Sequence, residues 1–128
     1  MPPDPDPFDL TDIPSVADYK RAFLACRGAL VGKKYLELLQ AHYQAPEHSI
    51  TAGELAEAVG YPSFNTANLQ YGRYARELCE ELKRDPKIHV AILATFSGGA
   101  QKTEDIRWTM LPQVVAALEA LRWVRAAN

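Results

Sequence analysis

The chain has 128 residues, of which 48% are hydrophobic and 23% are charged, a composition typical of one globular domain rather than of a disordered chain. Its formal net charge of −2 argues against binding of long nucleic acids by charge alone. No apolar run approaches the about 18 residues of a membrane span, and the N-terminus lacks the pattern of a signal peptide, so we expect a cytoplasmic protein without a membrane partner.

The acidic charge is concentrated at the N-terminus. Residues 1–14 hold five prolines and four aspartates, which predicts a disordered arm followed by a single domain over residues 15–128. Of the 16 acidic residues, five lie in residues 1–18, which contain no Lys or Arg, so 14 basic residues face 11 acidic ones in the remainder. This mild positive balance allows a compact site with a few phosphate contacts.

Two helices are predicted next. The first follows the N-cap residue Ser15 and is expected to end near Arg27. The second is expected from Leu30 to Tyr43, with Lys33 and Lys34 at its start. The helix dipole disfavours cations at that end. The two lysines therefore either serve an anionic partner or form a solvated pair.

The centre of the chain has a helix–turn–helix pattern. Thr51 and Glu54 form a capping box that predicts the start of a short helix, and Gly60 is expected to end it. The connector YPSFN, residues 61–65, then leads into a long helix that runs to about Leu82. In such a pair the second helix usually enters a groove of DNA.

The long helix has a core face and a polar face. Asn65 is expected to be its N-cap. Residues at spacings of four, three and four predict the face that packs on the core, namely Tyr71, Ala75, Leu78 and Leu82. The outward set is Thr66, Asn68, Gln70, Arg73 and Arg76.

A β-hairpin is predicted after the long helix. Residues 88–96 (IHVAILATF) are rich in strand formers and predict a buried strand, residues 97–105 a turn, and residues 106–110 a returning strand. Pro112 is expected to open a final helix. The predicted fold class is therefore α+β, mainly α, with a helix–turn–helix core and a C-terminal β-hairpin, as in a winged helix.

Few residues suggest catalysis. The sequence has no Gly-rich phosphate loop, no nucleophile motif and no His-Asn-His nuclease signature. Cys26 and Cys79 lie in helical patterns and are expected to be buried free thiols. His42, His48 and His89 lack partners at metal-ligand spacing. We expect no metal, no cofactor and no enzymatic activity of this chain itself.

The connector offers unusual chemistry. Tyr61 and Pro62 place apolar rings at the start of a helix, where N–H groups favour an anion. A phosphate oxygen prefers hydrogen-bond donors and water as neighbours. A polarisable and weakly hydrated anionic atom is better suited to contact with these apolar rings. The alternative is an ordinary turn with a packed ring.

The run ITAGELAEAVGYPSFNTANLQYG, preceded by LLQAHYQAP, resembles the sulfur-binding domain of type IV, modification-dependent restriction endonucleases, over roughly residues 15 to 120. These enzymes cut phosphorothioate DNA, in which a non-bridging phosphate oxygen is replaced by sulfur. The resemblance implies a shallow apolar cavity made by a Tyr-Pro pair, a basic side chain from an earlier helix region and a small residue at the next helix start. The nuclease domain, usually of the His-Asn-His type, is separate.

The resemblance implies a sulfur site made of Tyr61, Pro62, Ala67 and Lys33. Asn65 is the alternative to Ala67, and Lys34 and Arg27 are alternatives to Lys33. Further DNA contacts are expected from Arg27, Lys34, Ser63, Asn65, Thr66, Asn68, Arg73, Gln101 and Lys102.

The expected partner is double-stranded DNA with phosphorothioate linkages, bound by a monomer that could pair in a full-length enzyme. One rival is a winged-helix transcriptional regulator that reads unmodified DNA, which predicts a dimer and a palindromic site. Another is a protein-interaction domain, which predicts no DNA binding at low salt.

Overall fold

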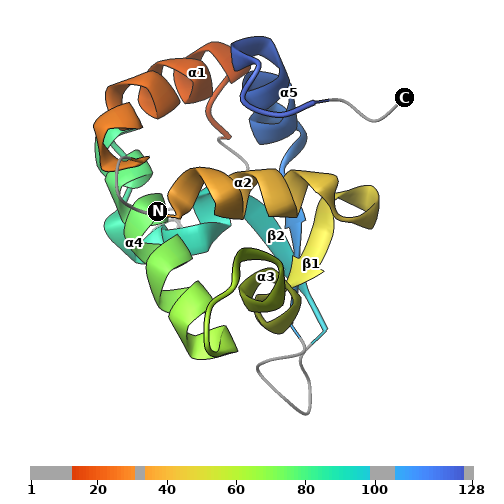
Figure 1. The fold of residues 1–128 in the computed structure, drawn as a ribbon. Coiled ribbons are helices and arrows are strands. Elements are labelled where there is room, and N and C mark those ends of the chain that lie inside the picture. Colours follow the sequence, from red (N-terminus) through yellow and green to blue (C-terminus); the bar gives the residue numbers. More distant parts are fainter. Residues whose placement is uncertain (1–12, 31–33, 99–105, 126–128) are drawn as a thin grey trace.

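The computed structural model describes residues 13–30, 34–98 and 106–125. Most of the predicted arm lies outside the described residues, as do Lys33, Gln101 and Lys102. The described chain forms an α+β fold that is mainly helical, as the sequence predicts (Figure 1). The α-helices are α1 (Val16–Ala25), α2 (Tyr35–Gln44), α3 (Ala52–Val59), α4 (Phe64–Glu81) and α5 (Pro112–Leu121). The strands are β1 (Ser49–Thr51), β2 (Ala94–Ser97) and β3 (Arg107–Met110), and the 3-10 helices are η1 (Arg27–Leu30), η2 (Pro46–His48) and η3 (Pro86–Ile92).

Helices α1 and α3 both begin with a capping box. In α1 the Ser15 hydroxyl accepts from the Asp18 N–H at 3.1 Å, and the Asp18 carboxylate accepts from the Ser15 N–H at 3.3 Å. Thr51 and Glu54 exchange the same two bonds at 3.1 and 3.0 Å in α3. Gly60 ends α3 with a φ of +81°, a conformation that glycine adopts without a Cβ penalty. The predicted start and end of α3 are confirmed.

The first two helices are shorter than predicted. Helix α1 ends at Ala25, before the expected end near Arg27, and residues 27–30 form η1. Helix α2 begins at Tyr35 with Lys34 as its N-cap residue, not at Leu30. Gly28 lies in η1, and the backbone freedom of glycine disfavours a continuing α-helix. The correction places Lys34 at the helix boundary itself.

The three strands form one antiparallel sheet in the order β1-β3-β2. Ile50 and Phe96 both lie opposite Trp108, from β1 and β2 respectively. The β2–β3 pair confirms the returning strand of the predicted hairpin. Strand β1 was not predicted, because its three residues are too few to show a periodic pattern.

The predicted buried strand over residues 88–96 is wrong for most of its length. Residues 86–92 form η3, and only residues 94–97 form β2. Asp85 begins η3 because its carboxylate accepts from the Lys87 N–H at 2.9 Å, and Pro86 suits the first helical position. Ile88 and residues 90–93 are buried nonetheless. A short apolar run predicts burial but does not distinguish a strand from a helical turn.

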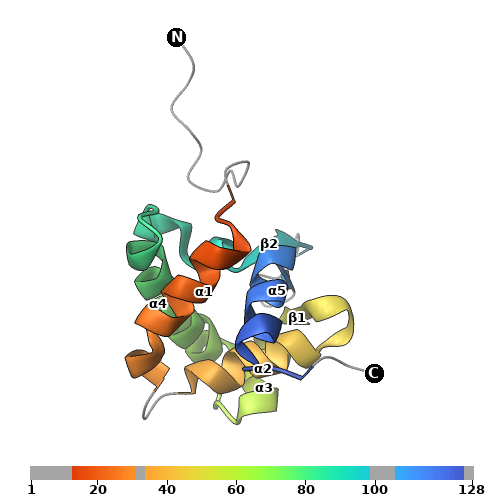
Figure 2. The same ribbon diagram turned by 90° about the horizontal axis from the view of Figure 1, so that it is seen from above.

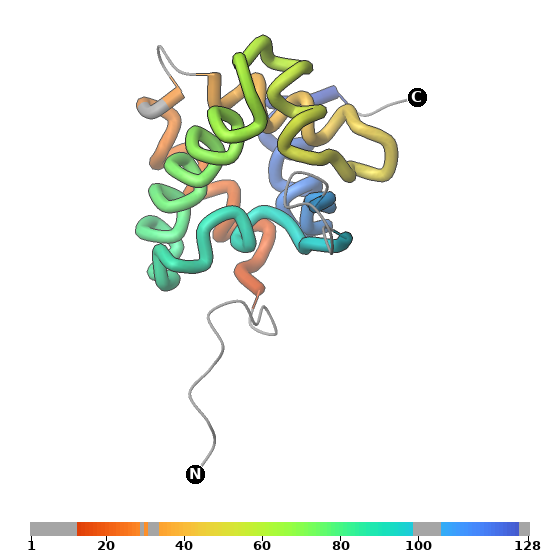
Figure 3. The backbone as a smooth tube through the Cα atoms, turned by 90° about the horizontal axis from the view of Figure 1, so that it is seen from below, coloured from red at the N-terminus to blue at the C-terminus, as the bar shows by residue number. Residues whose placement is uncertain are grey.

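Helix α4 is the element against which the others pack. It contacts α1, α2 and α3, and its most extensive contacts are with η3, which runs back beside it (Figure 3). Helices α1 and α5 pack against each other at one end of the molecule, and α3 lies towards the other end (Figures 1 and 2). The predicted core face of α4 is confirmed, since the following side chains are buried: Tyr71, Ala75, Leu78 and Leu82.

Aromatic rings fill much of the core. Tyr19, Phe23, Tyr71 and Tyr74 are fully buried. The ring of Tyr74 stacks on that of Tyr35 with centroids 5.0 Å apart, which joins α4 to α2. Stacked aromatic pairs stabilise by about 0.5 to 1.5 kcal/mol beyond the burial of their area.

His42 is part of the core. Its Nε2 lies 2.9 Å from the carbonyl oxygen of Trp108, and its Nδ1 lies 2.7 Å from the hydroxyl of Tyr71. Because a carbonyl only accepts, Nε2 carries the hydrogen and the Tyr71 hydroxyl donates to Nδ1. Burial lowers the pKa of His42 to about 4, so the ring is neutral at pH 7. His42 thus connects α2, α4 and β3.

Candidate functional site

The connector was predicted over residues 61–65, but α4 already begins at Phe64, so only Gly60 to Ser63 join α3 to α4. The Tyr61 N–H donates to the carbonyl oxygen of Ala56 at 2.8 Å, so the backbone of Tyr61 is fixed to the last turn of α3. Tyr61 is partly buried, and Pro62 and Ser63 are exposed. Burial raises the pKa of the Tyr61 phenol, which therefore stays neutral. The connector presents two uncharged rings at the surface.

Lys34 reaches this connector from the N-cap position of α2. Its Nζ donates to the carbonyl oxygen of Val59 at 2.6 Å and lies 5.5 Å from the centroid of the Tyr61 ring. The last carbonyls of a helix attract a cation, and an aromatic face does so too. Both contacts hold the ammonium group beside the Tyr61–Pro62 pair.

The start of α4 has no side-chain cap. Ser63, not the predicted Asn65, is its N-cap residue, and the Ser63 hydroxyl makes no capping bond but lies 3.4 Å from the Thr66 hydroxyl. The first turn contains no acidic residue. In α1 and α3, by contrast, a hydroxyl accepts from one first-turn N–H and a carboxylate accepts from the N-cap N–H, whereas α2 and α5, like α4, have no side-chain cap. The first turn of α4 therefore keeps N–H donors and a positive dipole end for an external anion.

The predicted sulfur-site residues are only partly brought together. Tyr61, Pro62 and Lys34 form one cluster, whereas Lys33 lies outside the described residues. Ala67 is fully buried, and Asn65, its alternative, is exposed.

The predicted DNA contacts fall into three groups. Ser63, Asn65 and Thr66 lie in the cap and first turn of α4, beside the cluster. Arg27 is exposed on η1, and Gln101 and Lys102 lie outside the described residues. Of the other three, Lys34 lies beside the Tyr61 ring, and Asn68 and Arg73 line a separate groove along α4.

That groove has a volume of about 460 Å³. One wall is α4, which contributes Asn68, Leu69, Gly72, Arg73 and Arg76.

The opposite wall comes from segments that are distant in sequence. It includes Lys87 to Val90 of η3, Phe96 of β2 and Trp108 of β3. Sequence reasoning missed Lys87, His89 and Phe96, because the predicted strand over residues 88–96 did not place them beside α4.

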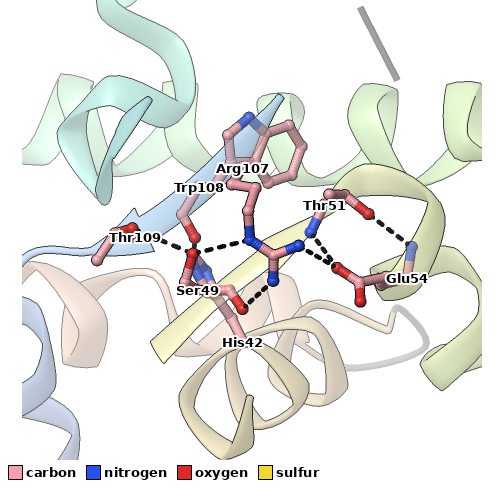
Figure 4. A network of polar contacts seen from close by, with 7 residues as sticks. All are labelled: His42, Ser49, Thr51, Glu54, Arg107, Trp108 and Thr109. Atoms are coloured by element: carbon pink, nitrogen blue, oxygen red, sulfur yellow. Dashed lines mark hydrogen bonds and ion pairs between the residues drawn. The ribbon is translucent and has the colours of Figure 1, made fainter. Parts of the chain in front are cut away.

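A polar network orients α3 from the sheet (Figure 4). The Arg107 guanidinium pairs with the Glu54 carboxylate at 3.1 Å and donates to the Ser49 carbonyl at 3.0 Å. The Thr109 hydroxyl donates to that of Ser49 at 3.2 Å. The hydrogen bond from the Thr51 backbone N–H is the main cause that lowers the pKa of the Glu54 carboxyl. The positive charge of Arg107 lowers this pKa further. Both members of the ion pair are about half exposed, so the pair itself contributes little stability and mainly fixes geometry.

The cysteines have no chemical role that the structure supports. Cys26 and Cys79 are buried free thiols, as predicted, and burial raises the pKa of each to about 11. A protonated thiol is a poor nucleophile and a poor metal ligand. Among the described residues, no group of three or more His, Cys, Asp or Glu side chains is placed to hold a metal ion.

No helix in the described parts of the chain has both the length and the apolar character needed to cross a membrane. Comparisons of the chain with protein-family models, curated proteins and solved structures found no match. The case for a function therefore rests on the geometry around α4.

Proposed function

We propose that this chain recognises phosphorothioate-modified double-stranded DNA at the N-terminus of α4, as the reader module of a type IV restriction endonuclease. The observation that carries the proposal is the position of the Lys34 ammonium, 5.5 Å from the centroid of the ring of Tyr61, the residue that precedes exposed Pro62. A cation, two apolar rings and an uncapped helix start converge at one place on the surface.

Each part of the cluster suits one part of a phosphorothioate group. The sulfur atom is large, polarisable and more weakly hydrated than oxygen, so it contacts the rings of Tyr61 and Pro62 at little desolvation cost. The remaining non-bridging oxygen accepts from the first-turn N–H groups of α4. Lys34 supplies the positive charge that the diester needs. A normal phosphate would have to place a strongly hydrated oxygen against the rings.

The proposal assigns to Lys34 the role that the resemblance implied for Lys33. It also favours Asn65 over Ala67 beside the sulfur, because Asn65 is exposed and Ala67 is fully buried. Ser63, Asn65 and Thr66 contact base edges or a neighbouring phosphate. In this arrangement α3 and α4 act as a helix–turn–helix, and β2 and β3 form a wing of the winged-helix kind.

The deciding experiment is a binding titration with two duplexes of identical sequence, only one of which carries a single phosphorothioate. We expect at least about tenfold tighter binding to the modified duplex, or about 1.4 kcal/mol. Pro62→Ala should reduce this ratio towards one while leaving affinity for normal DNA nearly unchanged. Equal affinities of the unaltered protein for the two duplexes would show that the proposal is wrong.

A regulator that reads unmodified DNA is the second candidate. Arg73 and Arg76 are exposed on the body of α4, where a recognition helix carries its base contacts. This candidate predicts a stable dimer in sedimentation experiments. It also predicts that Arg73→Ala abolishes sequence preference whether or not sulfur is present.

A further inference from the structure

The groove between α4 and η3 has features of a second ligand site, separate from the Tyr61–Pro62 pair. Its volume of about 460 Å³ lies within the range of about 300 to 1,000 Å³ typical of small-molecule pockets. It opens along the body of α4, whereas the Tyr61–Pro62 pair precedes that helix. We propose that this groove binds a single nucleotide, with its base unpaired and its phosphate held by the cations at the rim.

Positive charge is concentrated at the groove. Arg73, Arg76 and Lys87 line it, and no carboxylate from the described residues does. Their side chains form no ion pair with another described residue, although Glu77 and Glu80 lie one turn further along α4. In a chain with a net charge of −2, such a cluster complements an anion. Two guanidinium forks suit the oxygens of a phosphate.

Exposed apolar side chains occur in the same groove. Leu69 is 52% exposed and Phe96 is 47% exposed, and they are two of the three exposed large hydrophobic side chains among the described residues. A base has an apolar face that stacks on an aromatic ring, and such stacking tolerates any base. Phe96 therefore offers a stacking surface next to the cations.

Gly72 and His89 lie where the two walls of the groove meet. Gly72 is buried, and a Cβ at this position would lie 3.8 Å from Nδ1 of His89, so the His89 side chain lies directly beside the helix backbone. His89 itself has φ 52° and ψ −134°, a strained conformation for a residue other than glycine, and such strain concentrates at binding sites.

A nucleotide is complementary both to the cations and to the exposed apolar side chains of the groove. Its base stacks on Phe96, the Asn68 amide donates to and accepts from the base edge, and its phosphate contacts Arg73, Arg76 and Lys87. An acidic peptide would use the charges but would leave the stacking surface of Phe96 unused. The nucleotide can be free in solution or be an unpaired nucleotide within a DNA strand.

The test uses the full chain and unmodified ligands, so it does not depend on the sulfur site. Calorimetric titration with deoxyadenosine monophosphate should show binding at low salt, and deoxyadenosine or inorganic phosphate alone should bind at least about tenfold more weakly. Phe96→Ala should weaken binding roughly 5- to 100-fold through lost stacking. Arg73→Gln should weaken it about tenfold, and Arg125→Gln, a matched change at an exposed arginine outside the groove, should not alter it.

A second arm distinguishes the source of the nucleotide. Fluorescence anisotropy compares a fully paired duplex with one that carries a single bulged adenosine. Preference for the bulged duplex, lost in Phe96→Ala, supports an unpaired nucleotide in a strand, whereas binding of the mononucleotide alone supports a free ligand. The proposal is overturned if neither ligand binds, if binding survives both groove substitutions, or if an acidic peptide binds the groove while nucleotides do not.

Discussion

Lys34 shows how one side chain acquires a role through its neighbours. It is the N-cap residue of α2, a position that the helix dipole disfavours for a cation. The carbonyl of Val59 and the ring of Tyr61 offset that cost. The same contacts hold the positive charge beside the connector. Substitutions of Lys34 can therefore distinguish a purely structural role of this lysine from a role in DNA binding.

Lys34→Gln should reduce the affinity for phosphorothioate DNA at least about fivefold, because the amide can replace the hydrogen bond but not the charge. Lys34→Arg keeps the charge and should retain most of the affinity. Thermal unfolding of both variants checks that the fold is unaffected. If Lys34→Gln binds the two duplexes like the unaltered protein, the lysine has a structural role only.

His42 makes stability depend on pH. Its pKa is about 4 in the folded protein and about 6.5 in an unfolded chain, so the unfolded state binds more protons between these values. The contribution is complete above pH 6.5 and is lost as pH falls towards 4. The total loss is about 3 kcal/mol.

We therefore expect denaturant unfolding to show a fall in the free energy of unfolding between pH 7 and pH 4.5. In His42→Gln, whose amide can bond to both Tyr71 and Trp108, that fall should be smaller by about 2 to 3 kcal/mol. Other titrating groups are the same in both proteins and cancel in the difference. An equal fall in both would show that His42 is not the cause.

At the scale of elements, the start of α4 differs from the starts of α1 and α3. Each of those two helices has a capping box, in which a hydroxyl accepts from one first-turn N–H and a carboxylate accepts from the N-cap N–H. Ser63 is a residue that could cap but does not. A helix start that is left without a side-chain acceptor trades some stability for the ability to bind an anion.

Ser63→Asp tests this trade directly. A carboxylate at the N-cap should raise the free energy of unfolding by about 1 kcal/mol and should weaken DNA binding at least tenfold by repelling phosphate. Ser63→Asn is the matched control, because it caps without a charge and should stabilise with a much smaller loss of affinity. Loss of both stability and affinity in Ser63→Asp would contradict the role assigned to this helix start.

Elements with strong local signals were predictable, and the others were not. The capping box at Thr51 and Glu54, the end of α3 at Gly60 and the start of α5 at Pro112 all depend on residues next to each other in sequence. Asp85 and Pro86 favour the start of the segment over residues 86–92 locally, but its place beside α4 depends on packing, which no local pattern contains. The groove was missed for the same reason, since one of its walls is made by this segment.

At the scale of the whole molecule, charge is unevenly distributed. The chain carries a net charge of −2, yet Lys34, Arg73 and Arg76 are placed along or beside α4. Binding through about three such cations releases few counterions from DNA. Affinity should therefore fall with salt, but less steeply than for a strongly basic protein.

The logarithm of the affinity for duplex DNA, plotted against the logarithm of salt concentration, should have a slope of about −3. Arg73→Gln should reduce the magnitude of that slope by about one, while Arg125→Gln should leave it unchanged. A slope near zero would exclude phosphate contacts as the source of affinity. A slope far steeper than −3 would require cations beyond those named here.

The sequence by itself determined the mainly helical α+β class, the helix pair around the connector, the core face of α4 and the buried thiols, because these follow from local caps and from the spacing of apolar residues. Only the tertiary structure decided that Lys34 lies beside Tyr61, that Ala67 is buried while Asn65 is exposed, and that Phe96 and Lys87 face α4 across a groove. Those facts depend on contacts between segments far apart in the chain, and the energies that fix them come from packing rather than from local preference.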